Sequence, residues 1–242
     1  MKENNIEKII GGGIEKEPKL ISTIFFIRHG ASEYKEYTNV SNEELERDLL
    51  PKGEDQIKET ASLVSSKINK DFPVRIITSG RVRAKQSADI LKEGLIASGI
   101  SVIPDKIHET KSFESTRFYG NSAEIFADLN NRYGKELENL WVNGKLTYDK
   151  VESFNDVTSR VKEAFIKSIR IFRKNNQGGH RDLSQIVLVS HGEVIDALFF
   201  GFGIGSFNDP ERKLKNGGIV EIEIFTNNVV IKYDNKNYTL EI

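Results

Sequence analysis

Short, continuous runs of β-branched and other apolar residues constrain the fold of this chain more than any other feature. Four runs are apolar enough for buried strands: Ile24–Ile27, Val74–Ile77, Ser101–Ile103 and Ile186–Val189. Such runs, without polar alternation, are typical of parallel strands that are covered on both faces. Between the runs, apolar residues recur at helical steps of three and four over 54–69, 82–98 and 156–174. The pattern predicts an α/β fold, a single-domain three-layer sandwich with helices on both faces of a mostly parallel central sheet.

One domain accounts for nearly the whole chain. Residues 1–20 contain Gly11-Gly12-Gly13 and a charged stretch, which predict a flexible N-terminal lead-in before a domain over 21–242. Near the end, Gly218–Phe225 and Val229–Tyr233 predict a hairpin across Asn227-Asn228, followed by a short run to Ile242. The stretch 110–150 is polar and rich in aromatic residues, which is typical of a lid-like insertion or of an aromatic mini-core over the sheet edge. Both interpretations stay open.

Composition excludes several classes of function. Lys and Arg number 35 against 36 Asp and Glu, so the formal net charge is −1 and a basic nucleic-acid or membrane surface is not expected. The absence of cysteine excludes disulfides, thiol catalysis and thiolate zinc sites. No apolar stretch is long enough to span a bilayer, and the first residues lack the apolar core of a signal peptide. We therefore expect a cytoplasmic protein, with homo-oligomerisation left open.

Two of the four histidines occupy the same local context. His29 and His191 each follow an apolar run and one polar residue, and each precedes a glycine. Because parallel strands place their carboxyl ends at one edge of a sheet, the two imidazoles are expected to share a site. Neither histidine has further ligands at helical spacing, so a metal site is not expected. A nucleophile elbow and a phosphate-binding P-loop are absent from the sequence as well.

Basic residues accompany both histidines. Arg28 directly precedes His29, and Arg83 stands where the helix over 82–98 is expected to begin. Guanidinium groups and the free N–H groups of a helix N-terminus both bind anions. Two arginines and two histidines therefore predict a pocket for a phosphoryl group.

Five ordered segments resemble signatures of a known family, the histidine phosphatase superfamily, which includes the cofactor-dependent phosphoglycerate mutases. Arg28-His29-Gly30 resembles its Arg-His-Gly signature, and Val189-Ser190-His191-Gly192 is similar to its second-histidine motif. Residues 48–56 are similar to its Leu-Thr-x-x-Gly-x-x-Gln stretch, and 83–88 to its Arg-Ala-x-Gln-Thr-Ala stretch. Residues 152–161 resemble the Glu-Ser-x-x-Asp-Val-x-x-Arg-Val helix of the phosphatase branch. The resemblance covers most of the chain after residue 22.

The resemblance implies a phosphate-handling site. It makes His29 the nucleophile that becomes phosphorylated, while Arg28, Arg83 and His191 hold the phosphoryl oxygens. Physical chemistry agrees, because a neutral imidazole can attack phosphorus and fixed positive charge stabilises the transition state without a metal or other cofactor. The family's general acid follows the third strand in a Leu-x-Glu context, which Ile107-His108-Glu109 fits. Glu109 is therefore the expected acid, and Glu114 stays the alternative.

The expected activity is metal-independent hydrolysis of a small phosphorylated metabolite through a phosphohistidine. A mutase is the second hypothesis, but Phe118-Tyr119-Gly120 lacks the histidine of the mutase His-Tyr-Gly, and 110–150 is mixed in charge. A phosphate-binding scaffold without turnover is the third, and it would need no nucleophile. We interpret Ser32 as a further donor to the phosphate, and Arg81 as a residue at the rim of the pocket, because Arg83 matches the position of the family's motif. We interpret Glu33 and Lys35 as surface charges and His180 as part of a solvated turn.

Overall fold

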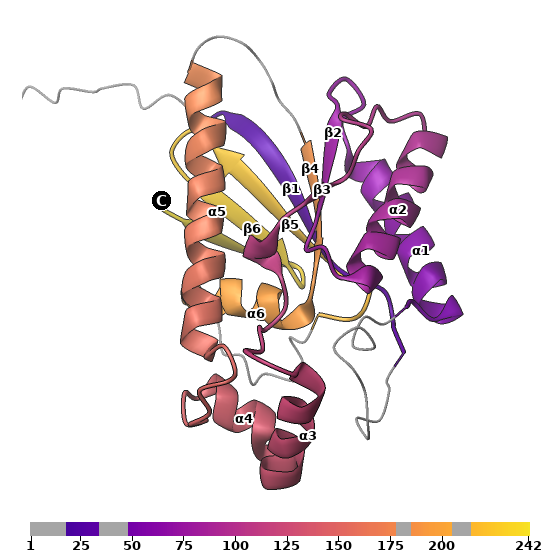
Figure 1. Ribbon diagram of the computed structural model, residues 1–242. Helices are drawn as coiled ribbons and strands as arrows, with labels where there is room; N and C mark the ends of the chain where they lie inside the picture. The colour runs from indigo at the N-terminus through magenta and orange to yellow at the C-terminus, as the bar shows by residue number, and fades with distance from the viewer. Residues whose placement is uncertain (1–17, 34–47, 178–184, 205–213) are drawn as a thin grey trace, which may run out of the picture.

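The computed structural model describes residues 18–33, 48–177, 185–204 and 214–242 (Figure 1). Its centre is a seven-stranded sheet in the order β3-β2-β4-β1-β5-β6-β7. The strands are β1 (Leu20–Arg28), β2 (Val74–Thr78), β3 (His108–Glu109), β4 (Gln185–Ser190), β5 (Ile219–Phe225), β6 (Val229–Tyr233) and β7 (Lys236–Leu240). Most of the predicted lead-in, residues 1–17, lies outside the described residues. Lys35 and His180 lie outside them as well.

The expectation of a mostly parallel sheet is only partly correct. The pairs β3–β2, β2–β4 and β4–β1 are parallel, whereas β1–β5, β5–β6 and β6–β7 are antiparallel. The antiparallel half arises because the predicted hairpin of β5 and β6 joins the sheet beside β1 and continues into β7. Asp234 and Asn235, with φ of 50° and 56°, form the two-residue turn between β6 and β7.

The prediction of a strand at Ser101–Ile103 is wrong. Only Val102 pairs with the sheet there, through an isolated bridge to Val74. Pro104 follows, and proline has no N–H with which to continue a ladder. The chain returns to the sheet a few residues later as β3, where His108 and Glu109 pair with the end of β2.

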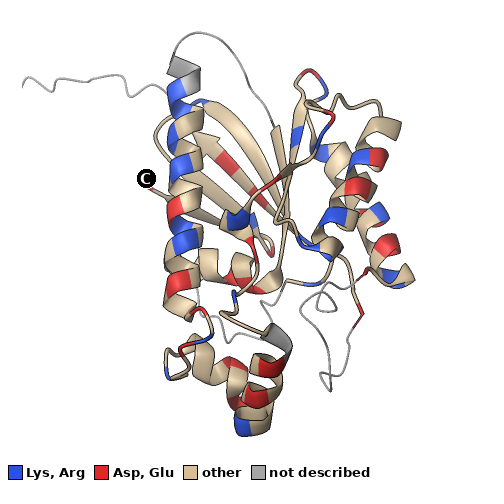
Figure 2. Ribbon diagram, in the orientation of Figure 1, with Lys and Arg blue, Asp and Glu red and all other residues tan. Residues whose placement is uncertain are grey.

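Helices cover both faces of the sheet, as expected (Figure 1). On one face, α1 (Pro51–Lys67) and α2 (Val82–Ala97) pack against every second residue of β1, including Phe25 and Ile27. On the other face, α5 (Phe154–Gln177) and α6 (Gly192–Gly201) pack against Ile24 and Phe26. The continuous apolar runs are therefore strands buried on both sides. The charged residues of these layers lie mainly on the helices (Figure 2).

The stretch between β3 and α5 forms the short helices α3 (Ser122–Tyr133) and α4 (Leu137–Val142), with the 3-10 turns η2 (Lys111–Phe113) and η3 (Gly134–Glu136). In Figure 1, α3 and α4 lie together at the lower end of the view, below the sheet. Within the described ranges, no helix is both long and apolar enough to cross a membrane.

Candidate active site

The carboxyl ends of four strands meet at one edge of the sheet. Arg28 of β1 lies opposite Ser190 of β4, and Thr78 of β2 lies opposite both Val189 and Glu109. The residue that follows each strand is therefore delivered to the same edge. Beyond the ladders, the His29 N–H donates to the Ser190 carbonyl at 2.9 Å, which extends the pairing of β1 and β4 by one residue.

Two hydrogen bonds hold the imidazole of His29 in one tautomer. Nδ1 lies 2.7 Å from the Gly30 carbonyl oxygen, which can only accept, so Nδ1 carries the proton. Nε2 accepts a hydrogen bond from the Nε of Arg83 at 3.0 Å. The ring is thus neutral, with the lone pair of Nε2 directed toward a guanidinium group.

His191 lies beside His29 and is completely buried. The centroids of the two imidazole rings are 5.1 Å apart. Arg83 Nη2 lies 3.1 Å from His191 Nδ1, and since arginine only donates, the proton of His191 sits on Nε2 and is donated to the Ser79 hydroxyl at 2.8 Å. Burial, reinforced by the charge of Arg83, holds the pKa of His191 well below its ordinary value. Arg83 therefore bridges two neutral imidazoles.

Arg28 lies across the first residue of α6. Its Nη1 donates to the Leu214 carbonyl at 2.6 Å, while its Nε is buried without a hydrogen-bond partner in the described part of the chain. A Cβ added to Gly192 would come within 3.2 Å of the Arg28 guanidinium carbon. The glycine after His191 therefore makes room for a guanidinium at the N-terminus of α6, where an anion is favoured.

Glycines also let α1 approach the loop that carries His29. A Cβ on Gly30 would lie 2.3 Å from the Gly53 carbonyl oxygen, and a Cβ on Gly53 would lie 2.0 Å from that of Ala31. Only glycine at both positions permits this contact. The Gly30 N–H donates to the Ser87 hydroxyl of α2 at 3.2 Å, so both helices of this face fix the loop.

Ser32, expected as a phosphate donor, lies further along this loop. It forms an isolated bridge with Leu49, and within the described residues its hydroxyl is not among the hydrogen-bond partners of His29, His191, Arg28 or Arg83. Its predicted role stays a prediction.

The two candidate acids occupy different surroundings. The Glu109 carboxylate is half exposed and pairs with Lys85 at 3.0 Å. A Cβ on Gly80 would lie 3.3 Å from the same carboxylate oxygen, which places Glu109 against the loop that holds Ser79. Glu114 is more buried and lies between two arginines, 3.8 Å from Arg81 and 3.6 Å from the Nε of Arg117.

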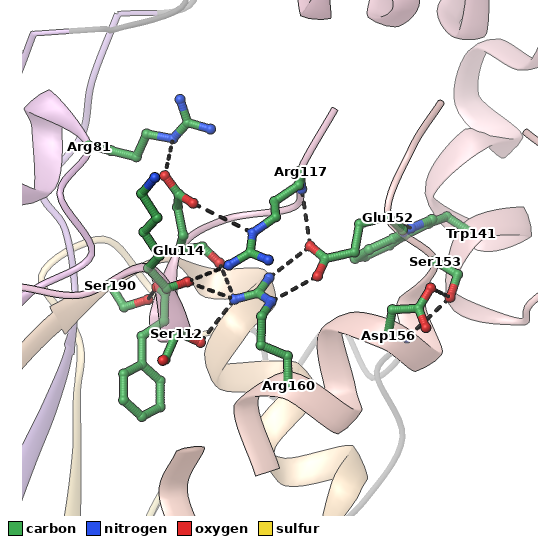
Figure 3. A network of polar contacts seen from close by, with 12 residues as sticks. Arg81, Ser112, Glu114, Arg117, Trp141, Glu152, Ser153, Asp156, Arg160 and Ser190 are labelled. Carbon is green, nitrogen blue, oxygen red and sulfur yellow. Dashed lines mark hydrogen bonds and ion pairs between the residues drawn. The ribbon is translucent and has the colours of Figure 1, made fainter. Parts of the chain in front are cut away.

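An ion-pair network holds the segment after β3 against the start of α5 (Figure 3). Arg160 binds both carboxylate oxygens of the buried Glu152 at 2.8 Å. The same guanidinium donates to the carbonyls of Ser112 and Glu114, at 2.9 and 3.2 Å. The Glu-Ser-x-x-Asp-Val-x-x-Arg stretch therefore has a structural role in this fold: it anchors the segment that carries Glu114.

The side chains of Ser153 and Asp156, in the same stretch, bind each other at the N-terminus of α5. The Asp156 N–H donates to the Ser153 hydroxyl at 3.1 Å, and this hydroxyl donates to the Asp156 carboxylate at 2.6 Å. Such reciprocal bonds satisfy free groups at a helix start.

A cavity of about 520 Å³ adjoins the histidine pair and is bounded largely by the 110–150 insertion. Arg83 belongs both to its wall and to the histidine cluster, so the cavity reaches the candidate active site. Its lining residues are Arg81, Arg83, Ser115, Thr116, Phe118, Phe126, Leu129, Asn130, Gly134, Lys135, Leu137, Glu138, Trp141, Leu146, Val151 and Glu193.

Two residues that bind the histidine pair were not predicted from the sequence. Ser79 directly follows β2 and binds His191; its position after a strand was the available signal. Asn216, whose Nδ2 donates to the His29 carbonyl at 3.2 Å, is 187 residues away in a segment without a recognisable motif.

Comparison with known proteins agrees with this geometry. The family model of the histidine phosphatase superfamily (branch 1) matches residues 24–237. A search of curated proteins gave no significant match.

Several solved structures share the fold at low sequence identity. YhfR of Bacillus stearothermophilus is 16% identical with a TM-score of 0.63, over 89% of this chain and 97% of that one. A mycobacterial glucosyl-3-phosphoglycerate phosphatase is 19% identical with a TM-score of 0.59, over 83% and 89%. A phosphoglycerate mutase of Bacillus anthracis is 15% identical with a TM-score of 0.59, over 91% and 92%. With paired strand-end histidines bridged by an arginine, and a family model matched over most of its length, this chain belongs to the histidine phosphatase superfamily, branch 1.

Proposed function

We propose that the protein is a phosphomonoesterase that works through a phosphohistidine at His29 and needs no metal ion. One observation carries the proposal: the Arg83 guanidinium bridges His29 Nε2 and His191 Nδ1 while His29 Nδ1 is bound to a carbonyl. Because Nδ1 of His29 carries the proton, Nε2 is the nitrogen that can attack phosphorus once Arg83 turns its hydrogen bond to the phosphoryl group, and the guanidinium puts positive charge where that group would meet it.

In the first step, Nε2 of His29 attacks phosphorus and the bond to the ester oxygen breaks. Arg83 moves its hydrogen bonds from the imidazoles to the phosphoryl oxygens, and Arg28 adds its buried Nε, which has no hydrogen-bond partner among the residues that the structure describes. We assign to Glu109 the proton that the departing alkoxide needs. In the second step, water attacks the phosphohistidine, the P–N bond breaks, and Glu109 takes the proton of the water.

The test is turnover of a panel of phosphomonoesters in the presence of a chelator. Wild-type protein is expected to release phosphate, and His29→Ala is expected to lose this activity. His108→Asn is the matched control, because it removes an exposed imidazole and should retain activity. Turnover in His29→Ala at the wild-type rate, or complete dependence on an added metal, would contradict the proposal.

A second assay separates hydrolysis from phosphoryl transfer within the superfamily. With 3-phosphoglycerate and 2,3-bisphosphoglycerate supplied together, a phosphatase releases phosphate, whereas a mutase interconverts the monophosphates. We expect phosphate release to dominate. Interconversion at many times the rate of phosphate release would favour the mutase.

A further inference from the structure

The cavity beside Arg83 has a cationic end. Arg81 and Arg83, both at the start of α2, line it together with Ser115 and Thr116. The Nε of Arg83 bonds His29 Nε2, so this end lies where the proposed reaction takes place. A phosphomonoester whose phosphoryl group sits there has its organic part directed into the rest of the cavity.

The remaining inner wall is largely apolar, with Glu193 of α6 as its half-buried acidic residue. Seven buried or half-buried apolar side chains form it, and they come from α3, α4 and the connecting segments: Phe118, Phe126, Leu129, Leu137, Trp141, Leu146 and Val151. The rings of Phe118 and Phe126 pack edge to face with centroids 6.5 Å apart. The indole N–H of Trp141 donates to the Glu152 carbonyl at 2.8 Å, so Trp141 offers a ligand its ring and no polar group.

The other polar lining residues lie mostly at the solvent side. Asn130, Lys135 and Glu138 are exposed, in contrast to the apolar residues of the wall. Hydroxyl groups of a sugar pressed against the apolar wall would lose their water without gaining hydrogen bonds, which is costly. An alkyl chain or an aromatic ring would instead gain free energy from burial. The volume also falls within the range of about 300–1,000 Å³ that small-molecule sites occupy.

We propose that this cavity selects phosphomonoesters whose alcohol has an apolar body, alkyl or aromatic, over phosphorylated sugars. The inference rests on the proposed phosphatase activity and names the class of its substrate. The selecting residues are the apolar side chains of the insertion, which gives the 110–150 stretch the part of a substrate wall.

The test uses linear alkyl phosphates from ethyl to octyl. The leaving alcohols have nearly the same basicity, so the chemical step is constant and only the apolar area changes. Full burial of one methylene corresponds to about fourfold, since its transfer is worth about 0.8 kcal/mol. We expect kcat/KM to rise two- to fourfold per methylene until the cavity is filled, and octyl phosphate to be preferred over glucose 6-phosphate.

Phe126→Ala tests the wall, and the octyl-to-ethyl ratio of kcat/KM is the readout. This ratio should fall at least fivefold in Phe126→Ala. Leu63→Ala is the control, because it removes an apolar side chain on the exposed surface of α1 and should leave the ratio unchanged. Equal ratios in Phe126→Ala and wild type would overturn the assignment of the wall.

Binding of alkylphosphonates to the wild-type protein keeps the test independent of variant folding and of turnover. Their P–C bond is not hydrolysed, and calorimetry should show affinity rising with chain length and a negative heat-capacity change. Turnover of all esters with no dependence on chain length overturns the apolar cavity and leaves the phosphatase intact. Length-dependent phosphonate binding without turnover of any ester supports the cavity and overturns the phosphatase.

Discussion

Replacing Arg160 by methionine is expected to destabilise the fold strongly. Methionine keeps most of the apolar stem but removes the guanidinium that holds Glu152 and the carbonyls of the segment after β3. Glu152 is only 3% exposed, so its carboxylate would be left buried with one donor remaining among the described residues, the Arg117 N–H. The substitution therefore leaves the negative charge of Glu152 without its cationic partner in a place where water cannot replace it.

The magnitude follows from burial. Breaking a buried ion pair by removing one partner costs roughly 3–5 kcal/mol. The Arg160 side chain is 14% exposed and one hydrogen bond to Glu152 survives, so we expect the lower end, about 3 kcal/mol in the free energy of unfolding. Urea denaturation followed by circular dichroism measures it.

Arg132→Met is the matched control. Arg132 also pairs with an acidic side chain, that of Asp128 one helical turn earlier, at 2.9 Å, but the two side chains are 57% and 38% exposed. Exposed pairs contribute between about 0 and 1 kcal/mol. A double variant, Glu152→Gln with Arg160→Met, removes the stranded charge and should be more stable than Arg160→Met alone. A loss below about 1 kcal/mol in Arg160→Met, or a double variant less stable than it, would refute this reasoning.

Three further predictions concern the site. Arg83→Met should lower kcat/KM about 10²- to 10³-fold, as when a donor to a developing charge is removed, while Arg81→Met should cost less than tenfold; equal losses would contradict the assigned roles. Glu109→Gln should slow an alkyl phosphate far more than p-nitrophenyl phosphate in pre-steady-state phosphorylation, because only the alkoxide needs a proton; the same dependence in Glu114→Gln would transfer the role to that residue. Because the pKa of His191 is depressed in the fold, the unfolded chain binds its proton first, so stability should fall as the pH drops below about 6.5. Between pH 7.5 and 5.5 urea unfolding should show about 1.4 kcal/mol less stability, and His191→Asn should abolish that part of the loss.

The helices that could be predicted are those whose apolar residues face one layer. In α1, α2 and α5 one stripe meets the sheet and the rest meets water, so helical period is visible in the sequence. The helix α6 was not predicted, because it is buried almost all round and Asp196 alone interrupts its apolar run Val194–Phe199, which is too little to reveal the helical period. The helices α3 and α4 contact one another and, through Trp141 and Phe154, the start of α5, and their short apolar stripes give little signal.

The position of the site could be predicted, and its bonding could not. His29 and His191 follow strands whose ends meet at one edge, so their proximity follows from topology. That Arg83 reaches both rings, and that Ser79 holds His191 in one tautomer, depends on side-chain directions that sequence spacing does not determine. The third strand was predicted at the wrong place because the apolar run Ser101–Ile103 has the composition of a buried strand. The two residues that do pair with β2, His108 and Glu109, are polar and give no such signal.

The most direct test of the proposed mechanism is to trap the phosphoenzyme. Wild-type protein mixed rapidly with a labelled phosphomonoester and quenched in alkali should carry label that is stable to base and lost in acid, as a phosphohistidine is. Peptide mapping by mass spectrometry should place it on His29. Label on another residue, or the same amount of label in His29→Ala, would contradict the central claim.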